Sequence, residues 1–315
     1  MTTAQPPRVS LLWTGPDGDG GDLVGDLVRA DDREVVVLPA GRGPVRVPRE
    51  QIRAMRKVPP RVVRPTSRVD DLVRLAARGW PGTGVVRMGG WELHTGGGHS
   101  RRANSCHPTG TPERELVLAV EQVTAFYRDR GLQPCFQLSG RTGRGDDEPT
   151  RLDELLAARG WRLEHPSVFL VADLERADLD RFERSEADAA STVSWSQTPG
   201  DEWLDVDPND HPARVPVLTS APAHYATLRL GRPIGIGRVV LTQDWAGLSC
   251  LFVDPTLRTA GHGSALTIAM MARARELGAR YCYLQVLASN HEALRLYEGL
   301  GFTEHHRYHY RCLPE

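Results

Sequence analysis

The stretch LRTAGHGSAL, residues 257–266, lies between an apolar run at 248–253 and a long helical pattern. The two glycines, Gly261 and Gly263, leave the backbone without side chains at the point where a strand ends and a helix begins. Arg258 precedes them. Glycines at such a junction let a bulky anion approach the N–H groups, and the helix dipole favours negative charge there. The spacing RxxGxG matches neither the Walker loop nor the dinucleotide motif GxGxxG. The stretch therefore predicts a pyrophosphate-binding turn, with a simple packing turn as the alternative.

Strand and helix patterns alternate on both sides of this turn. In the second half, strand patterns occur at 223–231, 233–242, 247–253, 281–287 and 302–311, and helical patterns at 261–279 and 290–301. A similar order occurs earlier, with helices at 67–80, 111–131 and 151–161 and strands at 85–95, 135–139 and 167–174. Ser67 and Thr111 are the expected N-caps. The recurrence predicts an internal duplication within an α/β (α+β) fold of mixed sheets and crossover helices.

Short strand patterns dominate the N-terminal part of the chain. They occur at 8–13, 22–30, 34–39 and 45–48, with Gly, Asp and Pro in the turns between them. Several short strands in so few residues predict a small all-β barrel, and the spacing resembles a Src-homology-3-like barrel. PPRVVRP at 59–65 is the expected linker. We expect three domains, at residues 1–60, 61–175 and 176–315.

Composition indicates an ordinary globular protein. The chain has 315 residues, 40% apolar and 25% charged, and a formal net charge of −1. This balance predicts no nucleic-acid or membrane partner, and no apolar run is long enough to span a bilayer. The N-terminus has no basic start or apolar core of a signal peptide. The five cysteines are scattered and odd in number, which predicts reduced thiols, no metal and a cytoplasmic location: Cys106, Cys135, Cys250, Cys282 and Cys312.

Two segments, 253–266 and 284–302, together resemble the GNAT superfamily of acetyl-CoA-dependent N-acetyltransferases. The family pattern is V-x-P, then RxxGxG/A, a helix, a strand and N-x-x-A-x-x-L-Y-x-x-x-G-F. Every element is present, at Val253, Pro255, Arg258, Gly261, Gly263, Asn290, Ala293, Leu296, Tyr297, Gly301 and Phe302. The match covers roughly residues 223–311.

The resemblance implies an acyl-CoA cleft between the strand ending at Val253 and the strand starting at Tyr281. Backbone of Leu251, Phe252 and Val253 would hold the pantetheine arm, which Asn290 would also contact. The pyrophosphate would lie on the loop formed by Arg258, Thr259, Ala260, Gly261, His262, Gly263 and Ser264. The phenol of Tyr297 would protonate the leaving thiolate, since its ordinary pKa near 10 keeps it protonated at neutral pH.

The resemblance assigns no residue as the general base. Family members often use a glutamate on the strand before the loop, whereas GLSCLFV at 247–253 has no carboxylate. The nearby candidates are Asp244, Asp254, Glu304 and His224, with bulk water as the alternative. Cys250 is interpreted as an apolar packing residue. HHRYHY at 305–310 predicts no metal site, because His305 and His306 would face opposite sides of a strand.

The first repeat lacks the phosphate loop. SCHPTGTPERE, at 105–115, stands in its place, with Pro112 and Glu113 at the expected helix start, where acid repels a pyrophosphate. We therefore interpret 61–175 as a degenerate GNAT-like domain that lines the acceptor site. Arg102, Asn104 and Ser105 are the candidate substrate residues, with a solvated strand face as the alternative.

The acceptor is predicted to be a primary amine, for which a protein lysine or another cationic amine is the first candidate. An acidic run at 173–210 would steer a cation, with a solvated pair of helices as the alternative. The three-part layout resembles actinobacterial histone-acetyltransferase-like proteins. The alternatives are a small-molecule acetyltransferase of the mycothiol-synthase kind and a non-catalytic acyl-CoA-binding regulator.

Overall fold

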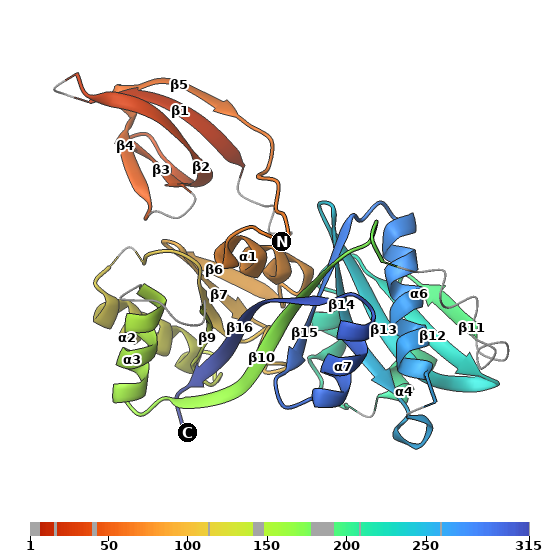
Figure 1. Ribbon diagram of the computed structural model, residues 1–315. Coiled ribbons are helices and arrows are strands. Elements are labelled where there is room, and N and C mark those ends of the chain that lie inside the picture. The colour runs from red at the N-terminus through yellow and green to blue at the C-terminus, as the bar shows by residue number, and fades with distance from the viewer. Residues whose placement is uncertain are drawn as a thin grey trace.

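A mixed sheet of 11 strands forms the body of the protein, and a separate sheet of five antiparallel strands precedes it (Figure 1). The computed structural model describes residues 7–15, 18–39, 43–112, 114–140, 148–177, 192–207, 209–258 and 260–314. Among these residues, no helix combines the length and apolarity needed to cross a membrane. The α/β fold with a small all-β unit at the N-terminus is confirmed.

The N-terminal sheet has the strand order β4-β3-β2-β1-β5, so β4 and β5 are its edges. Its strands are β1 Arg8–Thr14, β2 Gly20–Ala30, β3 Glu34–Pro39, β4 Val45–Pro48 and β5 Ile52–Lys57, with the 3-10 turn Arg49–Gln51 before β5. Its core consists of Val9, Leu11, Val35, Val37 and Val47. The last strand, β5, was not predicted, because it is exposed along nearly all its length and carries little apolar signal.

The first half of the body follows the predicted order of helices and strands. Its elements are α1 Val69–Gly79, β6 Gly84–Met88, β7 Trp91–Thr95, β8 Cys106–Pro108, α2 Leu116–Arg128, β9 Cys135–Gly140, α3 Glu148–Ala158 and β10 Arg162–Asp173. Both predicted N-caps are wrong. The hydroxyl of Ser67 accepts the N–H of Arg64 instead, at 2.9 Å, and α1 begins after Arg68. The N-cap of α2 is Glu115, and the carbonyl of Thr111 accepts the N–H of Gly90.

The second half of the body also follows the predicted order. Its elements are β11 Thr192–Ser196, α4 Asp201–Val206, α5 Arg214–Leu218, β12 His224–Leu230, β13 Arg232–Thr242, β14 Trp245–Val253, the 3-10 turn Pro255–Leu257, α6 His262–Glu276, β15 Tyr281–Leu287, α7 His291–Gly299 and β16 Thr303–Cys312. The edge strand β11 lies in a polar stretch that sequence reasoning assigned to helices.

The two halves exchange their last strands. The large sheet has the order β11-β12-β13-β14-β15-β10-β16-β9-β8-β7-β6. The pairs β14/β15 and β8/β9 are both parallel, whereas β10 pairs antiparallel with β15 and β16 pairs antiparallel with β9. Apart from the extra edge strand β11, the order therefore reads the same from both ends about the β10/β16 pair, which is what a duplicated unit predicts. Figure 1 shows β10 and β16 crossing the middle of the molecule.

The expected linker at 59–65 is packed onto the body. Val63 is 5% exposed and contacts the cluster of Phe169, Trp245 and Tyr283. The indole N–H of Trp245 donates to the carbonyl of Val63 at 3.0 Å. A buried indole needs such a partner, so this bond holds the segment between the two sheets against the large sheet.

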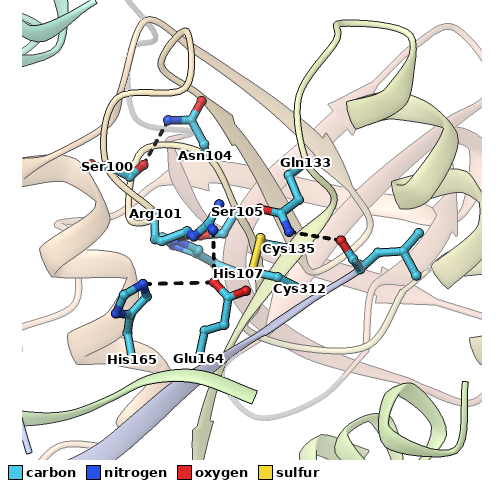
Figure 2. Close-up of a disulfide and its surroundings, with 11 residues drawn as sticks. Ser100, Arg101, Asn104, Ser105, His107, Gln133, Cys135, Glu164, His165 and Cys312 are labelled. Carbon is cyan, nitrogen blue, oxygen red and sulfur yellow. Dashed lines mark hydrogen bonds and ion pairs between the residues drawn. A yellow bond between two sulfur atoms is a disulfide. The ribbon is translucent and has the colours of Figure 1, made fainter. Parts of the chain in front are cut away.

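One cysteine pair differs from the expected reduced state. Cys135 of β9 and Cys312 of β16 are directly opposite in the strand register and form a disulfide, with Cα atoms 4.2 Å apart (Figure 2). The two residues are 177 positions apart in sequence, and nothing in their spacing indicates the pairing. The prediction that all five cysteines are reduced is therefore wrong for this pair, and Cys106, Cys250 and Cys282 are free thiols.

A bulge in β16 brings two histidines together, so the prediction that they face opposite sides is wrong. The register with β10 shifts at Phe169, and the Nδ1 atoms of His305 and His306 lie 2.8 Å apart. The Nε2 of His305 lies 3.0 Å from the Ser67 carbonyl and must donate to it, so its Nδ1 accepts the proton of His306. His306 stacks on Phe169 at 4.6 Å, and burial together with His305 lowers its pKa to about 3.

This lowered pKa predicts acid sensitivity of the fold. In the unfolded chain a histidine has a pKa near 6.5, so the unfolded state takes up the proton first and stability falls as pH drops below about 6.5. Between pH 7 and pH 5, His306 alone should reduce the free energy of unfolding by about 2 kcal/mol. Urea unfolding at both pH values measures the free energy of unfolding, and in His306→Phe its fall between pH 7 and pH 5 should be smaller by about 2 kcal/mol. The exposed His291→Gln is the control, and an unchanged pH dependence in His306→Phe would contradict the assignment.

Candidate active site

A cleft opens where β14 and β15 separate. The two strands pair in parallel only from Trp245 with Tyr281 to Gly247 with Tyr283. Beyond that point Leu248–Leu251 and Leu284–Leu287 become opposite walls of an open cavity of about 500 Å³. The backbone groups along these walls are not used by β14/β15 pairing. The cleft therefore lies where the sequence placed it and offers free amide groups to a long polar ligand.

A bulge in β14 lies inside this cleft. Cys250 has a positive φ of 56°, and the register with β13 shifts so that Cys250 and Leu251 have no paired partner on that strand. Such strained bulges occur preferentially beside functional sites, where they redirect backbone groups. Burial raises the pKa of the Cys250 thiol, opposed by the positive charge of Arg238. The thiol is therefore neutral at physiological pH and is no nucleophile.

Tyr297 and Asn290 reach the cleft from α7. Asn290 is the N-cap of this helix, and its side-chain oxygen accepts the N–H of Ala293 at 3.1 Å. Tyr297, 9% exposed, packs edge-on against Phe302 at 5.7 Å and also lines the cleft. Burial raises the pKa of Tyr297 to about 12, above the ordinary value near 10 used in the sequence argument. Tyr297 is thus a firmly protonated hydrogen-bond donor at the cleft.

The expected phosphate loop precedes α6 and is shaped by two glycines with different roles. Gly261 is the N-cap residue, with a positive φ of 85° that favours glycine, and no side chain caps the helix. A Cβ on Gly263 would lie 3.1 Å from the Cδ1 atom of Leu296, so this glycine allows α6 to approach α7. The first N–H groups of α6 are left for water or an anion.

The other predicted loop residues differ in their orientation. Arg258 lies over the ring of Phe252 at 5.9 Å, with its Nε 3.5 Å from the carbonyl of Val253. His262 is buried, and its Nδ1 has no hydrogen-bond partner among the described residues. Ala260 is exposed and Ser264 is half-buried, while Thr259 lies outside the described residues.

None of the four expected base candidates lines the cleft. Asp254 caps the 3-10 turn, and hydrogen bonds from Thr256 and Arg232 lower its pKa to about 2, which makes it a poor base. Glu304 forms a two-pronged ion pair with Arg307 on β16. His224 begins β12, and Asp244 lies in the turn at the opposite end of β14, where its carbonyl accepts backbone N–H groups. Neither residue borders the cavity.

A histidine that does line the cleft is His165, which sequence reasoning missed. It lies in a bulge of β10 with a positive φ of 48°, next to Pro166. Its Nε2 is 4.0 Å from Glu164, which pairs with Arg101 at 2.9 Å (Figure 2). A proline inside a strand pattern is the signal that would have found this bulge, because proline cannot donate to a sheet ladder.

The loop between β7 and β8 forms the wall contributed by the first half. Of the three predicted substrate residues, Arg102 lines the cleft. Asn104 is saturated within the loop: its oxygen accepts the N–H groups of Gly96 and Gly98, and its amide donates to the carbonyls of His99 and Ser100. Figure 2 shows the bond to Ser100. Ser105 is fully buried and bonds His107. We therefore correct the expected roles of Asn104 and Ser105: both hold the loop and neither borders the cavity.

The equivalent helix start in the first half is already occupied. The carboxylate of Glu115 accepts the N–H groups of Val117 and Leu118, at 3.2 and 3.4 Å, and so caps α2. Pro112 precedes this cap, and Glu113 lies outside the described residues. A carboxylate bound to these N–H groups excludes a pyrophosphate from them.

The described residues of the acidic run do not border the cleft. Much of it, residues 178–191, lies outside the described residues. Further along, Glu202 and Asp205 face a separate cavity of about 410 Å³ beside Asp254. Among the described residues, no group of three or more His, Cys, Asp or Glu side chains is arranged to hold a metal ion.

Comparison with known proteins agrees with this geometry. The family model described as "Probable histone acetyltransferase Rv0428c C-terminal" matches residues 66–311. The uncharacterized N-acetyltransferase YobR of Bacillus subtilis (strain 168) is 27% identical over 254 residues, covering 77% of this chain and 98% of that protein.

Two solved structures share the fold. A GCN5-related N-acetyltransferase from Kribbella flavida aligns with a TM-score of 0.59 at 13% identity, covering 78% of this chain and 95% of that one. A tandem GNAT protein from the clavulanic acid biosynthesis pathway aligns with a TM-score of 0.51 at 15% identity, covering 67% of this chain and 76% of that one.

Proposed function

The chain belongs to the family of probable histone acetyltransferase C-terminal regions and is an N-acetyltransferase of the GNAT type, and we propose that it transfers the acetyl group of acetyl-CoA to a primary amine. The observation that carries this proposal is the cleft between β14 and β15, with a buried, protonated Tyr297 on one side and an uncapped helix start at Gly261. The three expected domains, 1–60, 61–175 and 176–315, remain part of the proposal.

Donor binding uses the second half alone in this proposal. The free N–H groups of Gly261–Ser264 would hold the pyrophosphate, and the backbone from Leu251 to Val253, which has no partner on β15, would bond the pantetheine amides. Asn290 borders the path of the pantetheine. Glu115 blocks the matching position in the first half, which supports one donor site in each chain.

Acetyl transfer then needs two proton movements. A neutral amine attacks the thioester carbonyl, the C–N bond forms, and the tetrahedral intermediate expels the CoA thiolate. We assign removal of the amine proton to His165, since imidazole is the commonest general base and this one borders the cleft. Tyr297 donates a hydrogen bond to the sulfur as negative charge develops on it. With a pKa of about 12 the phenol stabilises this charge before it gives up its proton.

Calorimetric titration of the purified protein with acetyl-CoA and CoA tests the proposal. We expect one site in each chain, because no side chain caps the start of α6, whereas Glu115 caps the matching helix α2 of the first half. Two sites would overturn the degenerate first repeat and favour a small-molecule acetyltransferase with two donor sites. Absence of binding would overturn the proposed donor.

A further inference from the structure

An arginine that has no acidic partner among the described residues lines the cleft. Arg102 lines the cavity from the β7–β8 loop, and its guanidinium lies 5.5 Å from the centre of the Trp80 ring. Its Nε is buried without a hydrogen-bond partner, and no ion pair joins it to any carboxylate of the described residues. Burying an uncompensated charge costs several kcal/mol unless a ligand or counter-ion offsets the cost.

A second arginine increases the positive charge at this place. Arg238 is 1% exposed and lies 4.8 Å from the centre of the same Trp80 ring. Its Nε and one amino group donate to the carbonyls of Leu218 and Gly79, at 3.0 and 3.1 Å. Carbonyl oxygens satisfy these donors without cancelling the charge, and no described carboxylate pairs with Arg238. Two guanidiniums therefore lie against Trp80, which lines the cleft.

No carboxylate among the described residues borders this cavity. Its titratable and charged lining residues are Arg101, Arg102, His165, Cys250, Tyr297, Tyr308 and Tyr310. Arg101 is already neutralised by Glu164 at the edge of the cleft. The phenols of Tyr308 and Tyr310 donate to Gln285 and Gln137. The charge that remains is positive, which disfavours the cationic acceptor that the acidic run suggested.

The loop that carries Arg102 is held rigidly. Ser100 has a positive φ of 62°, and its hydroxyl accepts the indole N–H of Trp80 at 3.1 Å. Asn104 bonds four backbone groups of the loop, and Ala103 is fully buried. A non-glycine residue in this backbone region persists only where its surroundings fix it, and such positions cluster at binding sites. Arg102 is thus presented on a preformed scaffold.

We propose that Arg102 binds an anionic group of the acceptor, so that the enzyme acetylates amines that also carry a carboxylate or a phosphate. This inference rests on the proposed function and names its substrate class. The planar fork of a guanidinium bonds both kinds of oxyanion with two parallel hydrogen bonds. An anion fixed at Arg102, near the β14 bulge, would hold the amine of the same molecule within the cleft beside the thioester.

A matched pair of product-like ligands tests this proposal without a known acceptor. N-acetylglycine and N-acetylglycinamide differ only in the carboxylate, and each is titrated calorimetrically into the protein saturated with CoA. Charge-assisted hydrogen bonds contribute about 1.5–3 kcal/mol, so the acid should bind at least tenfold more tightly than the amide. Arg102→Gln should abolish the preference, and Arg102→Lys should restore part of it.

The control is Arg307→Gln, which removes an arginine that is paired with Glu304 outside the cavity and should keep the preference. Equal affinity for acid and amide, including no measurable binding of either ligand, would overturn the proposal. A preference that persists in Arg102→Gln would also overturn it. Failure of CoA itself to bind would instead contradict the proposed function, so the two failures are distinguishable.

Turnover distinguishes this role from a purely catalytic one. Free-thiol release is compared for amino acids and for their amides. The amine of an amide is less basic, so a larger fraction of it is neutral, and without a contribution from Arg102 the amides should react faster. Arg102→Gln should raise KM for the acids and leave the amides unchanged. An equal fall in kcat for the amino acids and their amides would show that Arg102 acts on the thioester. Faster turnover of lysine peptides than of every amino acid tested would favour a protein acceptor. Either result would overturn the proposal.

Discussion

Replacement of Tyr297 by phenylalanine is expected to lower kcat about a hundredfold while the affinity for acetyl-CoA changes little. The phenol is the donor proposed to meet the developing thiolate, and positioned acids contribute at least this factor. Because burial raises the pKa of Tyr297 to about 12, the loss should be uniform from pH 6 to pH 9. Single-turnover acetyl transfer, followed by free-thiol release, measures it.

Tyr308→Phe is the matched control for this prediction. Its phenol lines the same cleft and donates to Gln285 at 3.1 Å, so its loss should change kcat only a few-fold. An unaltered kcat in Tyr297→Phe would refute the assigned acid. A fall that appears only above neutral pH would show that a different group titrates.

Replacement of Ser264 by aspartate is expected to weaken acetyl-CoA binding roughly a hundredfold or more. Ser264 is half-buried in the first turn of α6, beside the N–H groups proposed to hold the pyrophosphate. A carboxylate there faces like charges across a few ångströms, and each such pair costs about 4 kcal/mol at 4 Å near a protein surface before salt screens it. Gly263→Asp is a less direct test, because its side chain would also contact Leu296.

The control is Ser264→Asn, because asparagine is nearly the same size as aspartate and carries no charge. Its affinity for acetyl-CoA should remain within a few-fold of that of the natural protein. Equilibrium titration at two salt concentrations compares the three proteins. Higher salt should reduce the aspartate effect, because screening weakens repulsion between exposed charges. Equal affinities for the Asp and Asn variants would place the pyrophosphate elsewhere.

Local patterns were sufficient to predict most helices and strands of the fold. Apolar periodicity identified α6 and β15, and the combination around Gly261 and Tyr297 located the cleft. Features that depend on register between distant segments were not predictable. The pairing of Cys135 with Cys312 and the contact of His305 with His306 both follow from how β16 lies between β9 and β10.

The acceptor end of the site shows the same limit. The sequence gives Arg102, Asn104 and Ser105 as neighbours, but only the folded loop shows that Arg102 borders the cavity and Asn104 is fully bonded. His165 looks like an ordinary strand residue until the bulge beside Pro166 turns it toward the cleft. The charge of the acidic run was visible in the sequence, whereas the position of Glu202 and Asp205 beside a separate cavity was not.

The interleaved strands also determine when the large sheet can close during synthesis of the chain. A ribosome produces β16, residues 303–312, after every other strand of both halves, yet β16 lies between β10 and β9. Until those residues emerge, β9 and β10 have open edges, and neither half is a finished domain. The sheet therefore closes in both halves at once, when the last strand pairs with β9 and β10 together.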